Sequence, residues 1–194
     1  MTEIELKARV KDPKSLALLM NKKASFSFSV IRDDSYWKKD NLSIRIREEK
    51  FSNGKKDILV TYKRKEIRKE KDGSSIEVND EKECTVSSSS ALEEFLSDNG
   101  YSVQLKKHKE VTDWTLKLAP GDPLKEEGEA TFELCYVPPL GYFLEIEILS
   151  SENSEDVISK AHKKLEELLV FAGLKKEDIE PRYYSELLRE TEEK

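Results

Sequence analysis

Residues 3–10 alternate strictly between charged and apolar side chains, and this alternation constrains the fold more than any other segment. They read Glu-Ile-Glu-Leu-Lys-Ala-Arg-Val. Successive side chains of a β-strand point to opposite faces, so every charge here shares one face and every apolar group lies on the other. Taken alone, the segment predicts a half-buried strand whose charged face meets water.

Four later segments change that interpretation, because each places two like charges two residues apart on one strand face. They are Arg45-Ile46-Arg47, Glu81-Lys82-Glu83, Lys107-His108-Lys109 and Glu145-Ile146-Glu147. Like-charged neighbours on a sheet repel, so solvated faces usually mix signs. Here the sign alternates from segment to segment, beginning with the acidic pair Glu3 and Glu5. The pattern predicts a charged interior that faces metal ions and a polyanion, with apolar faces turned outward beneath helices.

The remaining periodicities predict an α+β fold. Strand patterns occur at 3–10, 26–37, 42–49, 57–65, 76–86, 101–118, 129–137 and 142–149. Helices are expected after Asp12-Pro13, from Ser90, over 154–172 and near Pro181. About eight strands in an antiparallel-friendly order favour a single domain over residues 1–194, a closed antiparallel barrel or tunnel with helices packed outside. Unpaired buried charge is very costly, so the lumen must stay wet or hold ions.

Composition excludes several classes of function. The formal net charge is -6, so nucleic acid is not an expected partner, and an anionic substrate would need a local positive cluster. Cys84 and Cys135 lack CxxC spacing, which fits a cytoplasmic protein better than a disulfide framework or a zinc site. No apolar run is long enough for a bilayer, so no membrane association is expected. With only His108 and His162 present, chemistry should depend on carboxylates, lysines, arginines and a metal.

Short motifs in order along nearly the whole chain resemble the CYTH superfamily, the triphosphate tunnel metalloenzymes. The first strand resembles the ExExK signature of that family at Glu3, Glu5 and Lys7. The other similar segments are Asp34-Ser35-Tyr36-Trp37, Leu42 to Glu48, Thr61-Tyr62-Lys63, the pairs Glu81/Glu83 and Lys107/Lys109, Leu140 to Glu147, and Arg182 to Leu188. The last of these is similar to the ending of the cyclase-like branch.

Two positions depart from the family pattern. Cys135 stands where the family often has aspartate, and Asn79 stands where it often has arginine. Losing one acid and one base would weaken a second metal site or one phosphate contact. Glu133, on the same strand face as Cys135, is a candidate replacement for the missing acid.

The charges suit a triphosphate, which carries about four negative charges that guanidinium and ammonium groups at several angles would neutralise. The candidate triphosphate ligands are Lys7, Arg45, Arg47, Lys63, Lys107 and Lys109. Mg²⁺ or Mn²⁺ takes carboxylate oxygens. The candidate metal ligands are Glu3, Glu5, Glu145 and Glu147, followed by Glu81, Glu83 and Glu133. The candidate catalytic residues are Lys63, Tyr36 and Glu147, with Tyr36 orienting or activating a nucleophile beside Lys63.

Each of these roles has a structural alternative. The carboxylates could simply neutralise lysines and arginines across the barrel. Tyr36 could be a buried tyrosine with a satisfied hydroxyl. Tyr183 and Tyr184 are expected to pack the last helix, and the basic run from Arg64 to Lys71 is expected to be a solvated hairpin tip.

The resemblance implies a metal-dependent enzyme that acts on a triphosphate. The tail and the segment from Leu140 to Glu147 favour a class IV adenylate cyclase-like enzyme, which forms cyclic AMP and pyrophosphate from ATP. Two alternatives stay open: a triphosphatase acting on inorganic or thiamine triphosphate, and a non-catalytic module that binds polyphosphate. Cyclisation and hydrolysis use the same charge clamp. The sequence therefore leaves open the reaction, the organic group, the number of metals and whether the chain forms a homodimer.

Overall fold

The computed structural model describes residues 2–40, 42–69, 75–118, 128–150 and 154–192, with side chains described except at residue 2, residues 63–81 and residue 192. The strands are β1 (Thr2–Val10), β2 (Ser25–Lys39), β3 (Leu42–Phe51), β4 (Lys56–Lys69), β5 (Ser75–Thr85), β6 (Ser102–Lys117), β7 (Glu129–Val137) and β8 (Gly141–Ser150). The helices are α1 (Pro13–Lys23), α2 (Ser90–Asp98), α3 (Glu155–Phe171) and α4 (Tyr184–Glu192), with a 3-10 turn at Lys176–Asp178. Within these residues the prediction of an α+β fold with eight strands is confirmed.

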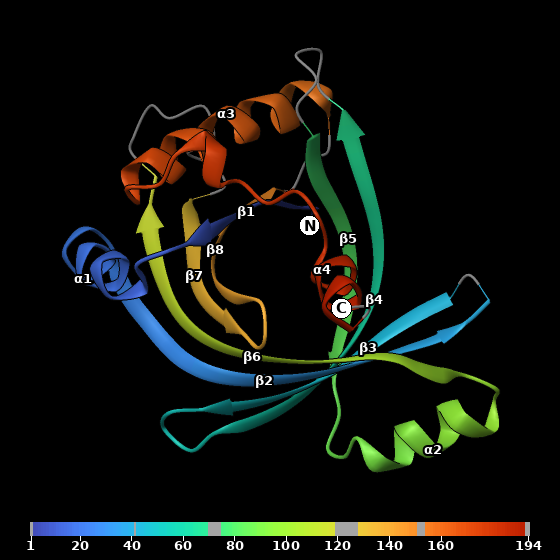
Figure 1. The fold of residues 1–194 in the computed structure, drawn as a ribbon. Coiled ribbons are helices and arrows are strands. Elements are labelled where there is room, and N and C mark those ends of the chain that lie inside the picture. The colour runs from blue at the N-terminus through green and yellow to red at the C-terminus, as the bar shows by residue number, and fades with distance from the viewer. Residues whose placement is uncertain (1, 41, 70–74, 119–127, 151–153, 193–194) are drawn as a thin grey trace.

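The strands form one strongly curved antiparallel sheet in the order β1-β5-β4-β3-β2-β6-β7-β8 (Figure 1). β8 lies beside β1, with residues 2–10 in register with residues 142–150. On its other side β1 meets β5 along a shorter seam, in which residues 2–5 are in register with residues 77–80. Strands from opposite ends of the sequence therefore lie side by side, and the first acidic pair is brought next to the last one.

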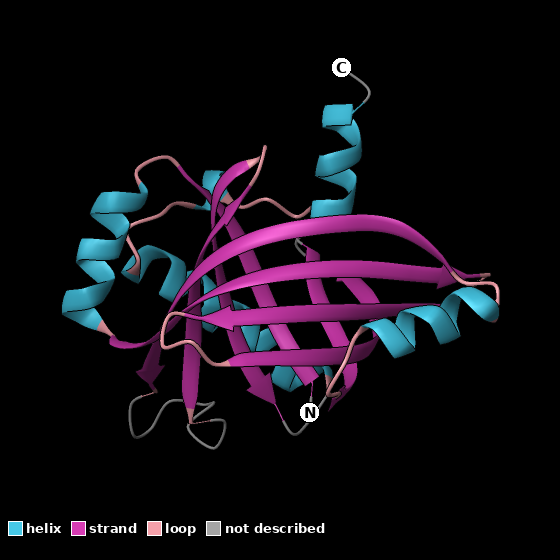
Figure 2. Ribbon diagram, turned by 90° about the horizontal axis from the view of Figure 1, so that it is seen from below, coloured by secondary structure: helices cyan, strands magenta, loops and turns pink. Residues whose placement is uncertain are grey.

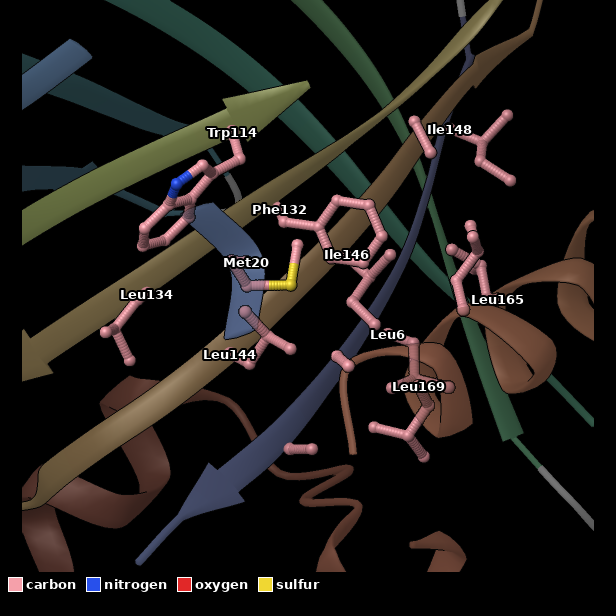
Figure 3. Packing of buried hydrophobic residues seen from close by; sticks show 14 of the residues in the cluster. Leu6, Met20, Trp114, Phe132, Leu134, Leu144, Ile146, Ile148, Leu165 and Leu169 are labelled. Atoms are coloured by element: carbon pink, nitrogen blue, oxygen red, sulfur yellow. The ribbon is translucent and has the colours of Figure 1, made fainter. Parts of the chain in front are cut away.

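The main hydrophobic core lies outside the curved sheet, between its outer face and helices α1 and α3 (Figure 3). Ile4, Leu6 and Ala8, the apolar positions of β1, are buried in this core. Leu165 and Leu169 of α3 belong to the same core and lie four residues apart, on one face of the helix. The prediction of apolar faces turned outward beneath helices is confirmed.

Helix α2 covers a smaller core on the outer face of β2 and β3, in which Trp37 and Ile46 are buried with Leu96. The Trp37 indole N–H donates to Ser35 Oγ at 3.1 Å, so its polar atom is satisfied. No helix among the described residues has the length and apolar character needed to cross a membrane. The cytoplasmic location and the absence of a nucleic-acid partner stay predictions.

Part of the sheet interior is apolar, and the sequence did not predict this. We call it the inner plug, and its buried residues are Val30, Val111, Cys135, Val137, Phe143 and Leu187. Leu187 comes from α4, which lies at the opening of the curved sheet in Figure 1 and projects away from the strands in Figure 2. The plug confines charged groups to the remaining part of the interior.

A strap of residues 179–183 runs along β1 and leads into α4. The Glu180 N–H donates to the Lys7 carbonyl oxygen at 2.8 Å. The buried Glu180 carboxylate accepts hydrogen bonds from Arg9 at 2.8 Å and Arg182 at 2.7 Å. The helix begins at Tyr184, later than predicted, because the residues before it follow the strand.

Candidate functional site

A cavity of about 920 Å³ occupies the polar part of the interior, and we call it the chamber. The predicted site residues that line it are Glu3, Glu5, Lys7, Tyr36, Arg45, Arg47, Glu83, Lys107, Lys109, Glu133, Glu145 and Glu147. The structure thus brings residues from seven strands to one space. The side chains of Lys63 and Glu81 lie outside the described part of the chain, so their roles stay predictions.

Asp34 anchors the basic side of the chamber. Its carboxylate is fully buried and accepts hydrogen bonds from Arg47 Nε at 2.7 Å and Arg47 Nη2 at 3.1 Å. Lys107 Nζ lies 3.1 Å from the same carboxylate. Burial alone would raise the pKa of Asp34, but Lys107 and Arg47 outweigh it and hold that pKa well below its ordinary value. Asp34 therefore stays ionised and fixes both cations.

Tyr36 shares this network. Its hydroxyl accepts a hydrogen bond from Lys107 Nζ at 3.1 Å and donates to Asp34 Oδ2 at 3.3 Å. Burial raises the pKa of Tyr36, but the positive charges of Lys107, Arg45 and Arg47 together outweigh it, and the pKa lies below its ordinary value. The phenol is thus easier to ionise than a free tyrosine, as a proton acceptor requires. Its hydroxyl is also satisfied, so the structural alternative still stands.

Lys109 is the cation at the centre of the acidic side. Its Nζ donates to Glu145 Oε2 at 2.5 Å and to Glu133 Oε2 at 3.2 Å. Arg32 adds a second contact to Glu133, with its Nη1 2.6 Å from Glu133 Oε1. Burial would raise the pKa of Glu145, but Lys109 outweighs it and lowers that pKa far below normal. Both carboxylates are therefore ionised and neutralised by cations of the protein.

Cys135 lies against the same acids. Its Sγ and one carboxylate oxygen each from Glu133 and Glu145 all lie within 4.8 Å of one another. Burial, together with the negative charge of Glu145, holds the pKa of Cys135 well above its ordinary value. The thiol is therefore protonated and a poor metal ligand. In the structure the cation between the two carboxylates is the ammonium of Lys109.

The other acids offer a better fit to a metal. Glu5 on β1 is directly opposite Glu147 on β8, and both line the chamber. Like charges directly opposite on a sheet repel, and a bound metal ion between these carboxylates would reduce that repulsion. Glu3 lines the same wall. Carboxylate oxygens are the ligands that Mg²⁺ and Mn²⁺ prefer, so the donor chemistry fits the predicted metal.

Several chamber residues were missed by the sequence interpretation or given another role. Tyr184 packs against the inner plug, in line with the expected packing role, and both Tyr183 and Tyr184 also line the chamber, together with Ser185 and Arg189 of α4. Arg32 is buried and also lines the chamber. It lies two residues before Asp34, so strand alternation could have placed it on the inner face.

Comparison with known proteins gives a family and several related folds. The CYTH domain family model matches residues 1–184. The PH1819 protein from Pyrococcus horikoshii OT3 is 26% identical, with a TM-score of 0.74 over 97% of this chain and 99% of its own. A candidate adenylate cyclase from Vibrio parahaemolyticus is 19% identical, with a TM-score of 0.71 over 97% of this chain and 98% of its own.

A more distant structure is HpAC1 from Hippeastrum, a candidate adenylyl cyclase described as having a dominant triphosphatase activity. It is 13% identical, with a TM-score of 0.59 over 98% of this chain and 95% of its own. At such identities the Vibrio and Hippeastrum structures show the shared fold alone. No curated protein matches the chain.

Proposed function

We propose that this chain, which belongs to the CYTH domain family, binds a nucleoside triphosphate with a divalent metal ion and converts ATP to cyclic AMP and pyrophosphate. In this proposal the curved sheet acts as a tunnel and the chamber holds the substrate. The observation that carries the proposal is the convergence of six cationic side chains from four strands on one cavity. They are Lys7, Arg32, Arg45, Arg47, Lys107 and Lys109.

The cations would hold the phosphate groups from different directions. Arg45 and Arg47 come from β3, whereas Lys107 and Lys109 come from β6 and Lys7 from β1. Guanidinium groups bind phosphate oxygens in pairs, while ammonium groups act as point charges. A chain of three phosphates is long enough to contact several members of this set at once, whereas a single phosphate would contact fewer of them.

The metal would be held by the acidic wall, with Glu5 and Glu147 as the primary ligands and Glu3 and Glu145 beside them. Bound Mg²⁺ or Mn²⁺ would supply positive charge to neutralise phosphate oxygens. Glu145 already forms an ion pair with Lys109. Glu145 would therefore bind a metal only if the Lys109 ammonium moved away from it toward a phosphate group.

Cyclisation forms a bond between the ribose 3′ oxygen and the α-phosphorus and breaks the bond from that phosphorus to the oxygen bridging to the β-phosphate. Pyrophosphate leaves, and the proton of the 3′ hydroxyl passes to a base. Tyr36 is the favoured acceptor because its pKa is lowered and Lys107 would stabilise the phenolate. Lys63 and Glu147 are the other candidates. The chamber cations stabilise the charge that develops on the leaving pyrophosphate.

Triphosphate hydrolysis is the second candidate, because it needs the same cations and metal but a water aimed at the terminal phosphorus. The Hippeastrum protein, which is described as having a dominant triphosphatase activity, has the same fold. The protonated Cys135 in place of an acid also keeps open the third candidate, a module that binds polyphosphate without turnover.

One set of reactions separates the three. The protein is incubated with ATP, inorganic triphosphate and thiamine triphosphate in Mn²⁺ and in Mg²⁺, and the products are resolved by chromatography. Cyclic AMP with pyrophosphate supports the proposal. Orthophosphate without cyclic AMP contradicts it in favour of the triphosphatase, and binding without product favours the polyphosphate module.

Variants test the binding site directly. Arg45→Ala/Arg47→Ala and Glu145→Gln/Glu147→Gln should weaken ATP binding, the second pair by removing the dependence on metal. Lys50→Ala on β3 and Glu110→Gln on β6 remove exposed charges from the same sheet, and they serve as matched controls. Circular dichroism checks folding. Unchanged affinity and metal dependence in both double variants would sink the proposal.

A further inference from the structure

Three lysine ammonium groups surround the ring of Tyr184 where the chamber meets the inner plug. Nζ of Lys7 lies 4.4 Å from the ring centroid, Nζ of Lys107 lies 5.0 Å from it, and Nζ of Lys109 lies 5.9 Å from it. An ammonium within about 6 Å of an aromatic ring centroid is attracted by the negative face of the ring. One neutral side chain from α4 therefore contacts three candidate phosphate ligands from β1 and β6.

The inner plug holds this ring in place. Phe143 packs edge-on against it, with ring centroids 5.1 Å apart and an interplanar angle of 89°. Leu187, one helical turn later on α4, is buried in the same plug. The Tyr184 hydroxyl is buried, and burial together with the negative charge of Glu145 holds its pKa well above normal. The ring therefore stays neutral and forms a fixed floor of the chamber.

Other contacts draw the three lysines in different directions. Lys7 Nζ donates to the Arg182 carbonyl oxygen at 2.5 Å. Lys107 is drawn toward Asp34 and Lys109 toward Glu145. Three ammonium groups in one cavity also repel one another. The ring of Tyr184 lies within about 6 Å of all three ammonium groups, and its attraction favours their convergence rather than their dispersal.

We propose that Tyr184 is a positioning residue whose ring keeps Lys7, Lys107 and Lys109 together, so that a triphosphate meets an assembled set of cations. The inference rests on the proposed binding of a triphosphate in the chamber. Without the ring, the long lysine side chains would have to be ordered when the ligand binds. The conformational entropy lost in that ordering would weaken the affinity. The ring does this without a negative charge, so it does not compete with phosphate.

The test compares three variants by titration with inorganic triphosphate in Mg²⁺. Tyr184→Leu should weaken binding roughly tenfold, and Tyr184→Phe should stay within about twofold of wild type because the ring remains. Leu187→Ala is the matched control, since it removes packing from the same helix and the same plug without touching a lysine. It should lower the unfolding temperature and leave the affinity within about twofold.

A purely structural role would give another result. Equal losses of affinity in Tyr184→Leu and Leu187→Ala would overturn the inference, as would no loss in either. A loss in Tyr184→Phe equal to that in Tyr184→Leu would assign the effect to the hydroxyl and also overturn it.

A second measurement serves if Tyr184→Leu does not fold. Pentafluorophenylalanine incorporated at position 184 keeps the shape of phenylalanine but reverses the charge distribution of the ring. Binding weaker than in Tyr184→Phe supports the inference, and equal binding contradicts it. Absence of triphosphate binding by the wild-type protein would instead contradict the proposed function, so the two failures are distinguishable.

Discussion

The chamber and the inner plug are built from the same strands and the same strand faces, yet one is charged and the other apolar. On β6 the inward positions run from Lys107 and Lys109 to Val111. On β8 the change is from Glu145 to Phe143. Two residues along a strand are enough to pass from an ion network to a packed hydrophobic cluster.

This difference shows that alternation determines the face of a side chain but not the depth at which it lies. Charges in a region that excludes water need partners of opposite sign, because their desolvation is otherwise uncompensated. The chamber meets this need at its border with the plug, where Lys109 joins Glu133 and Glu145. Substitutions in the plug should therefore destabilise the protein by removing packing, and substitutions in the chamber by leaving buried charges without partners.

Phe143→Ala should give the largest effect, because it opens a cavity in the plug at a residue with no exposed surface. The expected loss in the free energy of unfolding is about 3–5 kcal/mol. Urea denaturation measures it. Tyr142→Ala, at a neighbouring position that is 40% exposed, should cost about 1 kcal/mol or less. Similar costs for the two variants would contradict the assignment of the plug as a packed core.

Lys109→Met should come next, because it leaves Glu133 and Glu145 buried without their shared cation. The expected loss is about 3 kcal/mol at neutral pH. The pH dependence should also change sign. In the wild type the lowered pKa of Glu145 contributes stability above the ordinary carboxylate pKa, and this is lost as the pH falls through the folded-state value.

In Lys109→Met the two acids favour the protonated form, so the variant should become more stable on mild acidification. Thermal unfolding at several pH values from about 7 to about 4 measures how the stability of each protein changes with pH. Lys106→Met, which removes an exposed cation from the same strand, should keep the wild-type slope. If the stability of Lys109→Met changed with pH in the same way as that of the wild type, Lys109 would not determine the ionisation of these acids.

Glu180→Gln should loosen the strap and α4, because Glu180 holds both Arg9 and Arg182. Those arginines are partly exposed, so the expected cost is roughly 1 kcal/mol. Hydrogen bonds from Arg182 and Arg9 lower the pKa of Glu180 to about 2. Its contribution is therefore fully present above the ordinary glutamate pKa and is lost as the pH falls from there through the folded-state pKa of about 2.

Hydrogen exchange of the α4 amides measures this loosening. Glu190→Gln, which removes a single exposed partner of Arg182, should change the exchange less. Faster exchange in Glu190→Gln than in Glu180→Gln would show that the strap is held by the surface pair instead.

Asp113→Asn should give the smallest effect, with the opposite sign. Burial raises the pKa of Asp113 to about 6, so at neutral pH the folded protein carries an unfavourable buried charge. The stability of the wild type should decrease as the pH rises through about 6, and the variant should lack this decrease. At about pH 8 we expect a gain of about 0.5–1 kcal/mol, discounted for solvent screening. Equal melting temperatures of variant and wild type at pH 8 would contradict it.

The sequence predicts the faces of the strands well, because alternation is a local property. Every predicted site residue whose side chain is described lines the chamber, from Glu3 to Glu147. Arg32 was missed although the same alternation applied to it, since its neighbours on the same strand face are Val30 and Asp34 and it does not form a pair of like charges.

The inner plug and the place of α4 could not be predicted from local pattern. Val111 and Phe143 continue the inward face of strands that carry charges two residues away, and nothing in their spacing marks the change. Tyr184 reaches the chamber because the strap is bonded to β1, with the Glu180 N–H on the Lys7 carbonyl oxygen. That pairing joins distant segments and leaves no periodic signal.

The neighbourhood of β1 has a consequence for the order in which the protein can assemble. β1 leaves the ribosome before the other strands of the sheet, whereas its partner β8 and the strap that bonds to Lys7 follow all the other strands, and the Lys7 contact to Arg182 spans 175 positions. Pairings of such sequence separation form slowly, since the chain must close a long loop before they stabilise it. During synthesis Glu3, Glu5 and Lys7 therefore lack their partners on β8 until every other strand of the sheet has emerged. The chamber cannot exist in a half-made chain.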